Sequence, residues 1–406
     1  MKFYLETYGC KLNQSDSEII RNLLSDDYEE TLDFDSANFI ILNTCGVIDK
    51  TEKKIIDKTK YFQKRDKKVY WTGCLPLITR TNISNGSIGP NNILDIKKVI
   101  KENVHIYNNV KIDKASLCKK REENIFQSVA ISEGCLGNCS YCGSRFARKT
   151  LFSFSKENIL KEIREVLDER VKEILLTSQG LASYGLDRKK QELPELIKEI
   201  LEIKKDFRLK LGMMSPKYAK NIMDDLIELY KDTKMYKFIH LPLQSGDNDL
   251  LRKMNRGYSA EDFLQMCSKF RKISSDTIIA TDIIVGHPKE SEEAFQNTIR
   301  IIQKVKPDIL HVFRYSKREG TEDSKLKELN TQIKKQRSRY LVDLFQKYNL
   351  KKNKEFLNKE LEVLIIEDNN LARTNSGRAV VVKNGKAGES KKVKIVDCSW
   401  NYLIGQ

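Results

Sequence analysis

Three cysteines lie close together in the middle of the chain, in the segment SEGCLGNCSYCGSR from residue 132 to 145. Cys135, Cys139 and Cys142 have the spacing Cys-x-x-x-Cys-x-x-Cys, which lets three thiolates bind three corners of one iron–sulfur cubane. Such clusters usually take four cysteines, so a loop with three leaves one iron open to an outside ligand. The spacing therefore predicts a centre at which chemistry takes place.

Structural zinc is the alternative interpretation of the same three cysteines. Structural zinc sites are closed by four ligands, which commonly come as two close pairs. The sequence has no second Cys or His pair near this loop. The spacing therefore favours the iron–sulfur cluster.

A second set of cysteines follows three segments with the composition of short strands. These are KFYLETY, NFIILN and KVYWTG, at residues 2–8, 38–43 and 68–73, with helical patterns between them. The alternation predicts a parallel sheet, in which the carboxyl ends of the strands meet at one edge. Each strand end carries one cysteine, and we expect Cys10, Cys45 and Cys74 to meet there and bind a second cluster. The alternative is three small buried side chains, the usual role of a free cysteine.

Strand and helix patterns continue to alternate from about residue 126 to 350. The strand candidates are FQSVAIS, EILLTSQ, FRLKLGMM, KFIHLPLQ, TIIATDIIVG and DILHVFRYS. Six such repeats predict an incomplete parallel barrel that is open at one side, with functional loops at the carboxyl ends of its strands. Four residues at those ends are candidates for cofactor contacts, although ordinary loops carry the same types: Ser178, Gln179, Gln244 and Gly286.

The pattern changes after residue 351 to short strands without helices: ELEVLIIE, LARTN, RAVVVK, KKVKIVD and WNYLIG. This predicts a small all-β barrel. Residues 351–406 contain eleven Lys and Arg against seven Asp and Glu, and small basic barrels commonly present a face to RNA. A module that only caps the central domain is the alternative.

The composition of the whole chain agrees with a nucleic-acid partner. Its 406 residues include 73 Lys and Arg against 57 Asp and Glu, a net charge of +16. No apolar run approaches the roughly 20 residues of a membrane span, and the amino terminus has no cleavable apolar region, so we expect no membrane contact and a cytoplasmic location. The remaining cysteines and the four histidines are scattered, which favours structural roles for Cys118, Cys267, Cys398, His105, His240, His287 and His311.

Taken together, the motifs resemble those of the methylthiotransferase branch of the radical S-adenosylmethionine (SAM) enzymes, over essentially the whole chain. The matching segments are GCKLNQSDSE, NTCGV, GCLP, the cluster loop, HLPLQSGDNDLLRKMNRGY, IATDIIVGHP, FRYSKREGT and GRAVVVKNG. The resemblance implies three domains: a parallel-sheet domain of flavodoxin or Rossmann type at 1–110, a partial (β/α)6 radical SAM barrel at 121–350, and a TRAM barrel that binds RNA at 351–406.

The same resemblance implies two [4Fe–4S] clusters and SAM as cofactors. Cys135, Cys139 and Cys142 would hold the cluster that binds SAM and splits it to a radical, and Tyr141 would face the SAM adenine. Cys10, Cys45 and Cys74 would hold an auxiliary cluster that supplies sulfur. An external electron donor and a sulfur source are then needed, and we expect a monomer.

The cluster loop also points to a substrate. GCLGNCSYCGSRFAR resembles the archaeal and eukaryotic branch, which adds a methylthio group at carbon 2 of N6-threonylcarbamoyladenosine next to the anticodon of tRNA. A ring carbon–hydrogen bond has no useful acidity, so a radical replaces a general base. Other substrates remain open, namely isopentenyladenosine in tRNA or a ribosomal protein, as does a non-catalytic iron–sulfur protein that binds RNA or transfers electrons.

A few positions depart from the family pattern. The family's Ala-Arg-Gly after the cluster loop reads Ala147, Arg148 and Lys149 in this sequence. Gly180 and Leu181 replace Asp and Thr, His287 and Lys289 replace an aromatic residue and Gly, and Glu319 replaces Pro. The six cysteines of the two sets are all present.

Overall fold

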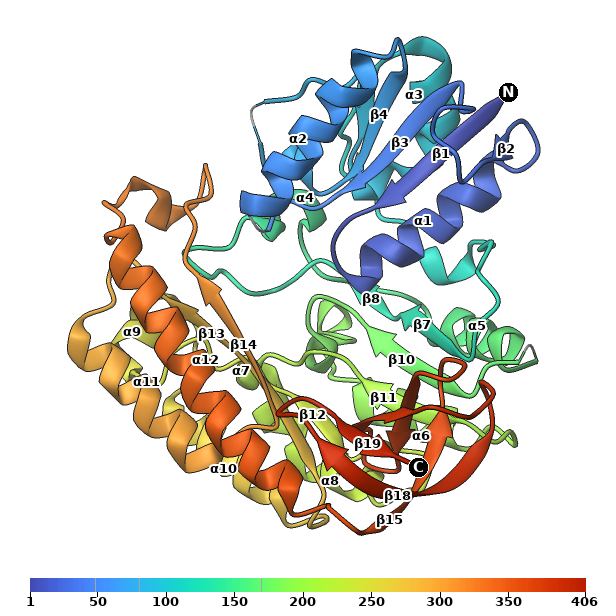
Figure 1. The fold of residues 1–406 in the computed structure, drawn as a ribbon. Coiled ribbons are helices and arrows are strands. Elements are labelled where there is room, and N and C mark those ends of the chain that lie inside the picture. Colours follow the sequence, from blue (N-terminus) through green and yellow to red (C-terminus); the bar gives the residue numbers. More distant parts are fainter. Residues whose placement is uncertain (48, 80, 169) are drawn as a thin grey trace. The chain divides into compact units, whose positions relative to one another are not determined.

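The computed structural model describes residues 1–47, 49–79, 81–168 and 170–406, which form two compact units (Figure 1). The first unit contains residues 1–122, 130–159 and 316–325, and the second contains residues 123–129, 160–315 and 326–406. Both three-cysteine sets therefore belong to the first unit. The domain boundaries near residues 110, 121 and 350 stay a prediction from sequence.

A parallel sheet of six strands, in the order β2-β1-β3-β4-β5-β6, forms the centre of the first unit. The strands are β1 (Lys2–Thr7), β2 (Glu29–Glu30), β3 (Phe39–Thr44), β4 (Lys68–Gly73), β5 (Gly86–Ile88) and β6 (His105–Ile106). The three predicted strands are present as β1, β3 and β4. The others have two or three residues each, too few to carry an alternating pattern.

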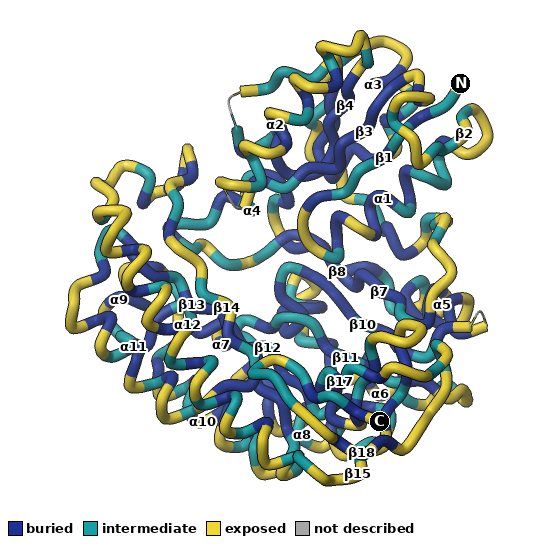
Figure 2. The backbone as a smooth tube through the Cα atoms, in the orientation of Figure 1, coloured by how far each residue is buried: buried dark blue, intermediate teal, exposed yellow. Residues whose placement is uncertain are grey.

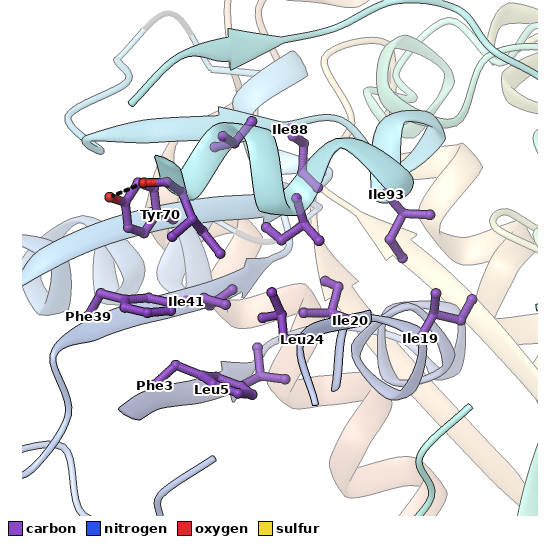
Figure 3. Close-up of a cluster of buried hydrophobic side chains, with 13 residues drawn as sticks. Phe3, Leu5, Ile19, Ile20, Leu24, Phe39, Ile41, Tyr70, Ile88 and Ile93 are labelled. Carbon is purple, nitrogen blue, oxygen red and sulfur yellow. Dashed lines mark hydrogen bonds between the residues drawn. The ribbon is translucent and has the colours of Figure 1, made fainter. Parts of the chain in front are cut away.

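Helices cover both faces of this sheet, because its residues alternate between two apolar layers. Figure 3 shows one layer, in which Phe3, Phe39 and Tyr70 of the strands pack with Ile20 and Leu24 of α1. In the other layer, strand residues such as Trp71 pack against Ile55 and Phe62 of α2. The helices of the first unit are α1 (Lys11–Leu24), α2 (Asp49–Gln63), α3 (Ile96–Glu102) and α4 (Ser144–Arg148). The helical pattern between the second and third predicted strands, VIDKTEKKIIDKTKYFQKR, starts at Val47, and α2 lies within it. Its residue Ile48 lies outside the described residues.

Six strands of the second unit form the predicted partial barrel. They are β7 (Phe126–Ala130), β10 (Glu173–Thr177), β11 (Arg208–Leu211), β12 (Phe238–His240), β13 (Ile278–Val285) and β14 (Ile309–Arg314). They pair as β11-β10-β7 and β12-β13-β14, and two parallel bridges, Leu209 with Met235 and Met213 with His240, link the halves. The predicted fold class is confirmed.

The helices of this barrel are α5 (Lys156–Asp168), α6 (Leu193–Leu201), α7 (Pro216–Ala219), α8 (Met223–Leu229), α9 (Asn248–Lys253), α10 (Ala260–Arg271), α11 (Glu292–Val305) and α12 (Thr331–Lys354). Most follow a strand, as a right-handed crossover requires. Among the described residues, no helix combines the length and the apolar character that a membrane crossing needs.

The carboxyl-terminal strands close into a separate small barrel, in the order β15-β16-β17-β19-β18. Its strands are β15 (Glu360–Ile365), β16 (Leu371–Thr374), β17 (Ala379–Val382), β18 (Ser390–Cys398) and β19 (Leu403–Gly405). Buried and exposed residues alternate in the middle of β18, so Val393 and Ile395 fill the interior while Lys392 and Lys394 face outward. Figure 2 shows the burial along the whole backbone. The predicted all-β barrel is confirmed.

Gly73, at the end of β4, offers a test of how tightly the strand ends of the first unit are packed. Its φ is +86°, and a Cβ there would contact the Thr44 carbonyl and lie 2.5 Å from Asn43 Oδ1. We expect Gly73→Ala to reduce the free energy of unfolding by about 2 kcal/mol or more. The matched control is Gly180→Ala, where the nearest atom is 3.9 Å away. Thermal unfolding of both variants measures the difference, and equal midpoints would contradict it.

Candidate active site

The three strand-end cysteines meet at the carboxyl edge of the first unit's sheet. Cys10 caps the amino terminus of α1, Cys45 follows β3, and Cys74 follows β4. In the strand order β2-β1-β3, the connections diverge between β1 and β3, which is where open α/β sheets bind ligands. A Cβ on Gly9 would lie 2.9 Å from Cys45 Cβ, which shows how close the loops before Cys10 and after β3 are.

Two asparagines fix these loops. Asn13 Nδ2 donates to the carbonyls of Tyr8 and Thr44, at 2.9 and 2.8 Å, and so joins the ends of β1 and β3. Asn43 Nδ2 donates to the Asn13 carbonyl at 2.6 Å and to Ser17 Oγ at 2.8 Å. Both asparagines are buried. The polar residues Asn13 and Ser17 of GCKLNQSDSE and Asn43 of NTCGV therefore fix the backbone segments that carry Cys10 and Cys45.

The environment of the thiols suits a metal cluster. No described cysteine forms a disulfide. Burial raises the pKa of the Cys74 thiol to about 11, Arg148 beside it acts in the opposite direction, and Cys10 and Cys45 raise it further as thiolates. Burial likewise raises the pKa of Cys45. Neighbouring thiols that disfavour one another's ionisation become thiolates together most readily when a cation binds them, so this arrangement fits the predicted iron–sulfur cluster. The role of the three cysteines as cluster ligands stays a prediction.

The second group of cysteines lies in the loop between β8 (Ser132–Glu133) and α4. A Cβ on Gly137 would lie 3.1 Å from Cys135 Sγ and 3.7 Å from Cys139 Sγ, so these two sulfurs face the same point. Cys142 N donates to the Cys139 carbonyl at 3.2 Å. Burial raises the pKa of Cys142, and Cys139 adds to the effect. The loop thus gathers its three thiols as the spacing predicts, and their role as cluster ligands stays a prediction.

A buried network of charged side chains connects the two cysteine groups. Arg148, at the end of α4, donates to Asp16 Oδ2 at 2.6 Å, to Asn13 Oδ1 at 2.9 Å and to Glu133 Oε2 at 3.0 Å. Lys114 bridges Asp16 and Glu133 from the other side, at 2.8 and 2.7 Å. All four ionic side chains are at most 4% exposed. Sequence reasoning missed this network, because its members are up to 132 positions apart.

The predicted cofactor residues lie in both units. Tyr141 is half-buried in the cluster loop of the first unit, and the other four belong to the second. Ser178 Oγ accepts from Gly180 N at 3.0 Å. Gln179 has contacts of its own within the described residues. The shared role of these residues in binding SAM stays a prediction.

Gln244 and Gly286 differ in how well they fit a ligand. Gln244 Oε1 is buried and accepts no hydrogen bond from the described residues, so a ligand at the end of β12 would supply a missing partner. Gly286 N donates to Glu290 Oε2 at 2.6 Å, and a Cβ on Gly286 would lie 3.2 Å from Lys334 Cβ. The glycine is therefore required for close packing against α12, whether or not a cofactor binds there.

Two histidines that the sequence left as scattered come together in the second unit. His240 and His311 both contact Asp282 Oδ1, at 3.0 and 2.8 Å. Their strands, β12 and β14, both pair with β13, which carries Asp282. The proximity of the two histidines could therefore have been predicted from the strand order, but not from their spacing in the sequence. The other two behave as expected, since His287 is buried against Tyr315 and His105 is bonded to Ser87 Oγ.

Comparison with known proteins finds family models that match three separate parts of the chain. Residues 2–89 match the model of the uncharacterized protein family UPF0004, residues 129–302 match the radical SAM superfamily, and residues 354–406 match the TRAM domain. Among solved structures, a radical SAM methyltransferase from Kitasatospora setae aligns over 80% of this chain and 77% of its own, with a TM-score of 0.55 and 12% identity. At that identity, the likeness describes the fold alone. The matches define the class as radical SAM enzymes.

Relatives of known name narrow the class. A protein of Archaeoglobus fulgidus, "Probable threonylcarbamoyladenosine tRNA methylthiotransferase", is 42% identical over 100% of this chain and 98% of its own length. A protein of Methanocaldococcus jannaschii with the same description is 36% identical over 100% and 97%. A "tRNA-2-methylthio-N(6)-dimethylallyladenosine synthase" of Protochlamydia amoebophila is 31% identical over 100% and 96%. The chain belongs to the tRNA methylthiotransferase family, and this membership implies a [4Fe–4S] cluster and SAM.

Lys149 allows a test of the backbone next to the cluster loop. It ends α4 with φ 57° and ψ −147°, a region that is open essentially to glycine alone. We expect Lys149→Gly to increase the free energy of unfolding by about 1 kcal/mol, because the strain disappears. The control is Lys189→Gly: Lys189 has φ 68° and ψ 12°, a left-handed conformation that costs less. Chemical denaturation compares the two variants, and a destabilised Lys149→Gly protein would overturn the assignment of strain.

Proposed function

We propose that this protein converts N6-threonylcarbamoyladenosine of tRNA to its 2-methylthio derivative. The observation that carries the proposal is the pair of three-cysteine groups in a single unit, in a chain that aligns end to end with relatives named for this reaction. The archaeal relatives are 33–42% identical, and the dimethylallyladenosine synthases are 30–32% identical. Threonylcarbamoyladenosine is therefore the better supported substrate.

We assign the two cysteine groups to two [4Fe–4S] clusters with separate roles. Cys135, Cys139 and Cys142 would hold the cluster that binds SAM, and Cys10, Cys45 and Cys74 would hold the auxiliary cluster. When bound, these cofactors supply a carbon-centred radical and the sulfur atom, which side chains cannot provide. The chain's own residues would hold the thiols in place and position the nucleoside.

The atoms and electrons of the proposed reaction determine which other partners the protein needs. One SAM gives the methyl group, and a second SAM accepts one electron and the hydrogen atom that leaves carbon 2. An external donor must therefore supply electrons, and a sulfur source must replace the sulfur that each turnover removes. We expect a monomer that works in the cytoplasm, where tRNA is modified.

The small β-barrel is proposed to bind the tRNA backbone. Exposed lysines follow its outer surface on β18 and the preceding turn: Lys383, Lys386, Lys391, Lys392 and Lys394. Ammonium groups that contact phosphates give affinity without sequence preference. The central barrel is left to select the nucleoside.

The proposal is tested by separating SAM cleavage from product formation. Reconstituted protein, SAM, a reductant and tRNA carrying threonylcarbamoyladenosine should yield a nucleoside heavier by one CH2S unit, measured by mass spectrometry. Replacing Cys10, Cys45 and Cys74 with Ala should leave formation of 5′-deoxyadenosine and abolish the methylthio product. Replacing Cys118, Cys267 and Cys398 is the matched control and should change neither. Product from the first variant would remove the auxiliary cluster from the reaction. If the wild-type protein methylthiolates only tRNA that carries dimethylallyladenosine, the proposed substrate is wrong and dimethylallyladenosine takes its place.

A further inference from the structure

Three polar side chains form a connected group on neighbouring strands of the central barrel. His240 at the end of β12 and His311 in β14 flank Asp282 in β13, and both rings contact the same carboxylate oxygen, at 3.0 and 2.8 Å. The two ring centroids are 5.8 Å apart. The side chains are 18%, 50% and 12% exposed for His240, His311 and Asp282, so the group is open on the side of His311.

The group lies on the inner face of the curved sheet. In strands, every second residue shares a face, so Phe238 and Ala280 share a face with His240 and Asp282. These apolar residues form a buried cluster with Tyr236 and Ile278. Tyr236 Oη donates to Glu173 Oε2 of β10 at 3.0 Å, and side chains two strands apart meet only across the inside of a curved sheet. The histidines and Asp282 thus stand directly above an apolar floor, on the side of the strands' carboxyl ends.

The chemistry of the group follows from its hydrogen bonds. A carboxylate only accepts, so each ring donates through the nitrogen that faces Asp282. Although burial alone would raise it, the bonds from His240 and His311 lower the pKa of Asp282 to about 2. The outer nitrogens, Nδ1 of His240 and Nε2 of His311, make no hydrogen bond within the described part of the chain. Two oriented acceptors, which become donors when the rings are protonated, face the interior.

Neighbouring residues extend this surface. Lys210 of β11 places its ammonium 4.2 Å from the ring centroid of Phe238, which precedes His240 by two residues on the same face. Phe313, two residues beyond His311, is 40% exposed, with its ring 6.3 Å from that of His311. Gln244, a predicted cofactor residue, donates its backbone N–H to the Asp282 carbonyl at 2.8 Å. The group is therefore bordered by the ammonium of Lys210, by the exposed ring of Phe313 and by Gln244, a predicted cofactor residue.

We propose that His240, Asp282, His311 and Lys210 form a receptor for the polar substituent on N6 of the substrate adenosine. This deepens the proposed function and rests on it. The threonylcarbamoyl group has ureido N–H groups, a hydroxyl and a carboxylate, which match ring acceptors and an ammonium. Phe313 offers a ring on which the purine stacks, as aromatic side chains do for unpaired bases. His311, half exposed at the rim, makes the first contact.

The same group explains how the site rejects an apolar substituent. A dimethylallyl chain on this surface would bury the outer ring nitrogens of His240 and His311 without hydrogen-bond partners, and sites built to hydrogen-bond a substrate discriminate strongly for that reason. A transition metal ion is the competing occupant of a two-histidine, one-carboxylate set. Such an ion would hold its ligand atoms about 3.3 Å apart. The distances of 3.0 and 2.8 Å are those of direct hydrogen bonds.

The test measures binding of three forms of one tRNA to the full-length reconstituted protein. The forms carry threonylcarbamoyladenosine, dimethylallyladenosine or unmodified adenosine next to the anticodon, and fluorescence anisotropy gives each Kd. Wild type should prefer the first form by about tenfold or more over the others. His311→Phe and Lys210→Met should each reduce that ratio to within about threefold of one, while affinity for the unmodified tRNA stays the same. Asp282→Asn, which leaves the rings unoriented, should act in the same direction.

Lys392→Gln on the small barrel is the matched control. It removes a surface charge and should weaken the binding of all three tRNA forms equally. If His311→Phe and Lys210→Met both keep the wild-type ratio of Kd values, the receptor is not formed by these residues. If wild type holds a non-iron metal ion, measured by plasma mass spectrometry, that the His311 variant lacks, the group is a metal site and the proposal falls. Failure of the proposed function looks different, because the protein would then bind the threonylcarbamoyl form preferentially but make no methylthio product from it.

Discussion

The first unit depends on one buried cluster of charges, formed by Asp16, Glu133, Arg148 and Lys114. Two cations and two anions compensate one another almost completely out of contact with water. Removing any single partner would leave a buried charge uncompensated, which typically costs about 3–5 kcal/mol. Arg148 is the centre, since its guanidinium reaches Asp16, Asn13, Glu133 and the surroundings of Cys74.

These four charged side chains connect the helices α1 and α4, each of which follows a cysteine of one of the two groups. Asp16 lies on α1, six residues after Cys10, and Arg148 ends α4, six residues after Cys142. Planar guanidinium geometry fixes the direction of both elements, which an ammonium in the place of Arg148 would not do. The ends of β1 and β3 are joined to the same network through Asn13. The segments that carry the six cysteines, from residue 10 to 142, are thereby joined by one set of buried hydrogen bonds, as the two proposed clusters would require.

Much of this arrangement follows from the sequence. The strands that end before Cys10, Cys45 and Cys74 were predictable because their apolar runs are short and bounded by glycine, and the rule for parallel sheets then brought the cysteines to one edge. The contacts of Arg148 with Asn13 and Asp16 were not predictable, because contacts between side chains far apart in the sequence leave no periodic signal. His240 and His311 appeared scattered for the same reason, although they lie on strands that both neighbour β13. Lys149 was visible as a departure, but only its backbone angles show the strain.

The central claim is that one unit holds two separate iron–sulfur clusters. Iron analysis with Mössbauer spectroscopy on anaerobically reconstituted protein tests it most directly, using wild type and two triple-alanine variants, one for each cysteine group. The account predicts about eight irons per wild-type chain in two four-iron clusters, and about four in each variant. Wild-type protein that saturates near four irons, or a triple variant that keeps the full iron content, would contradict it.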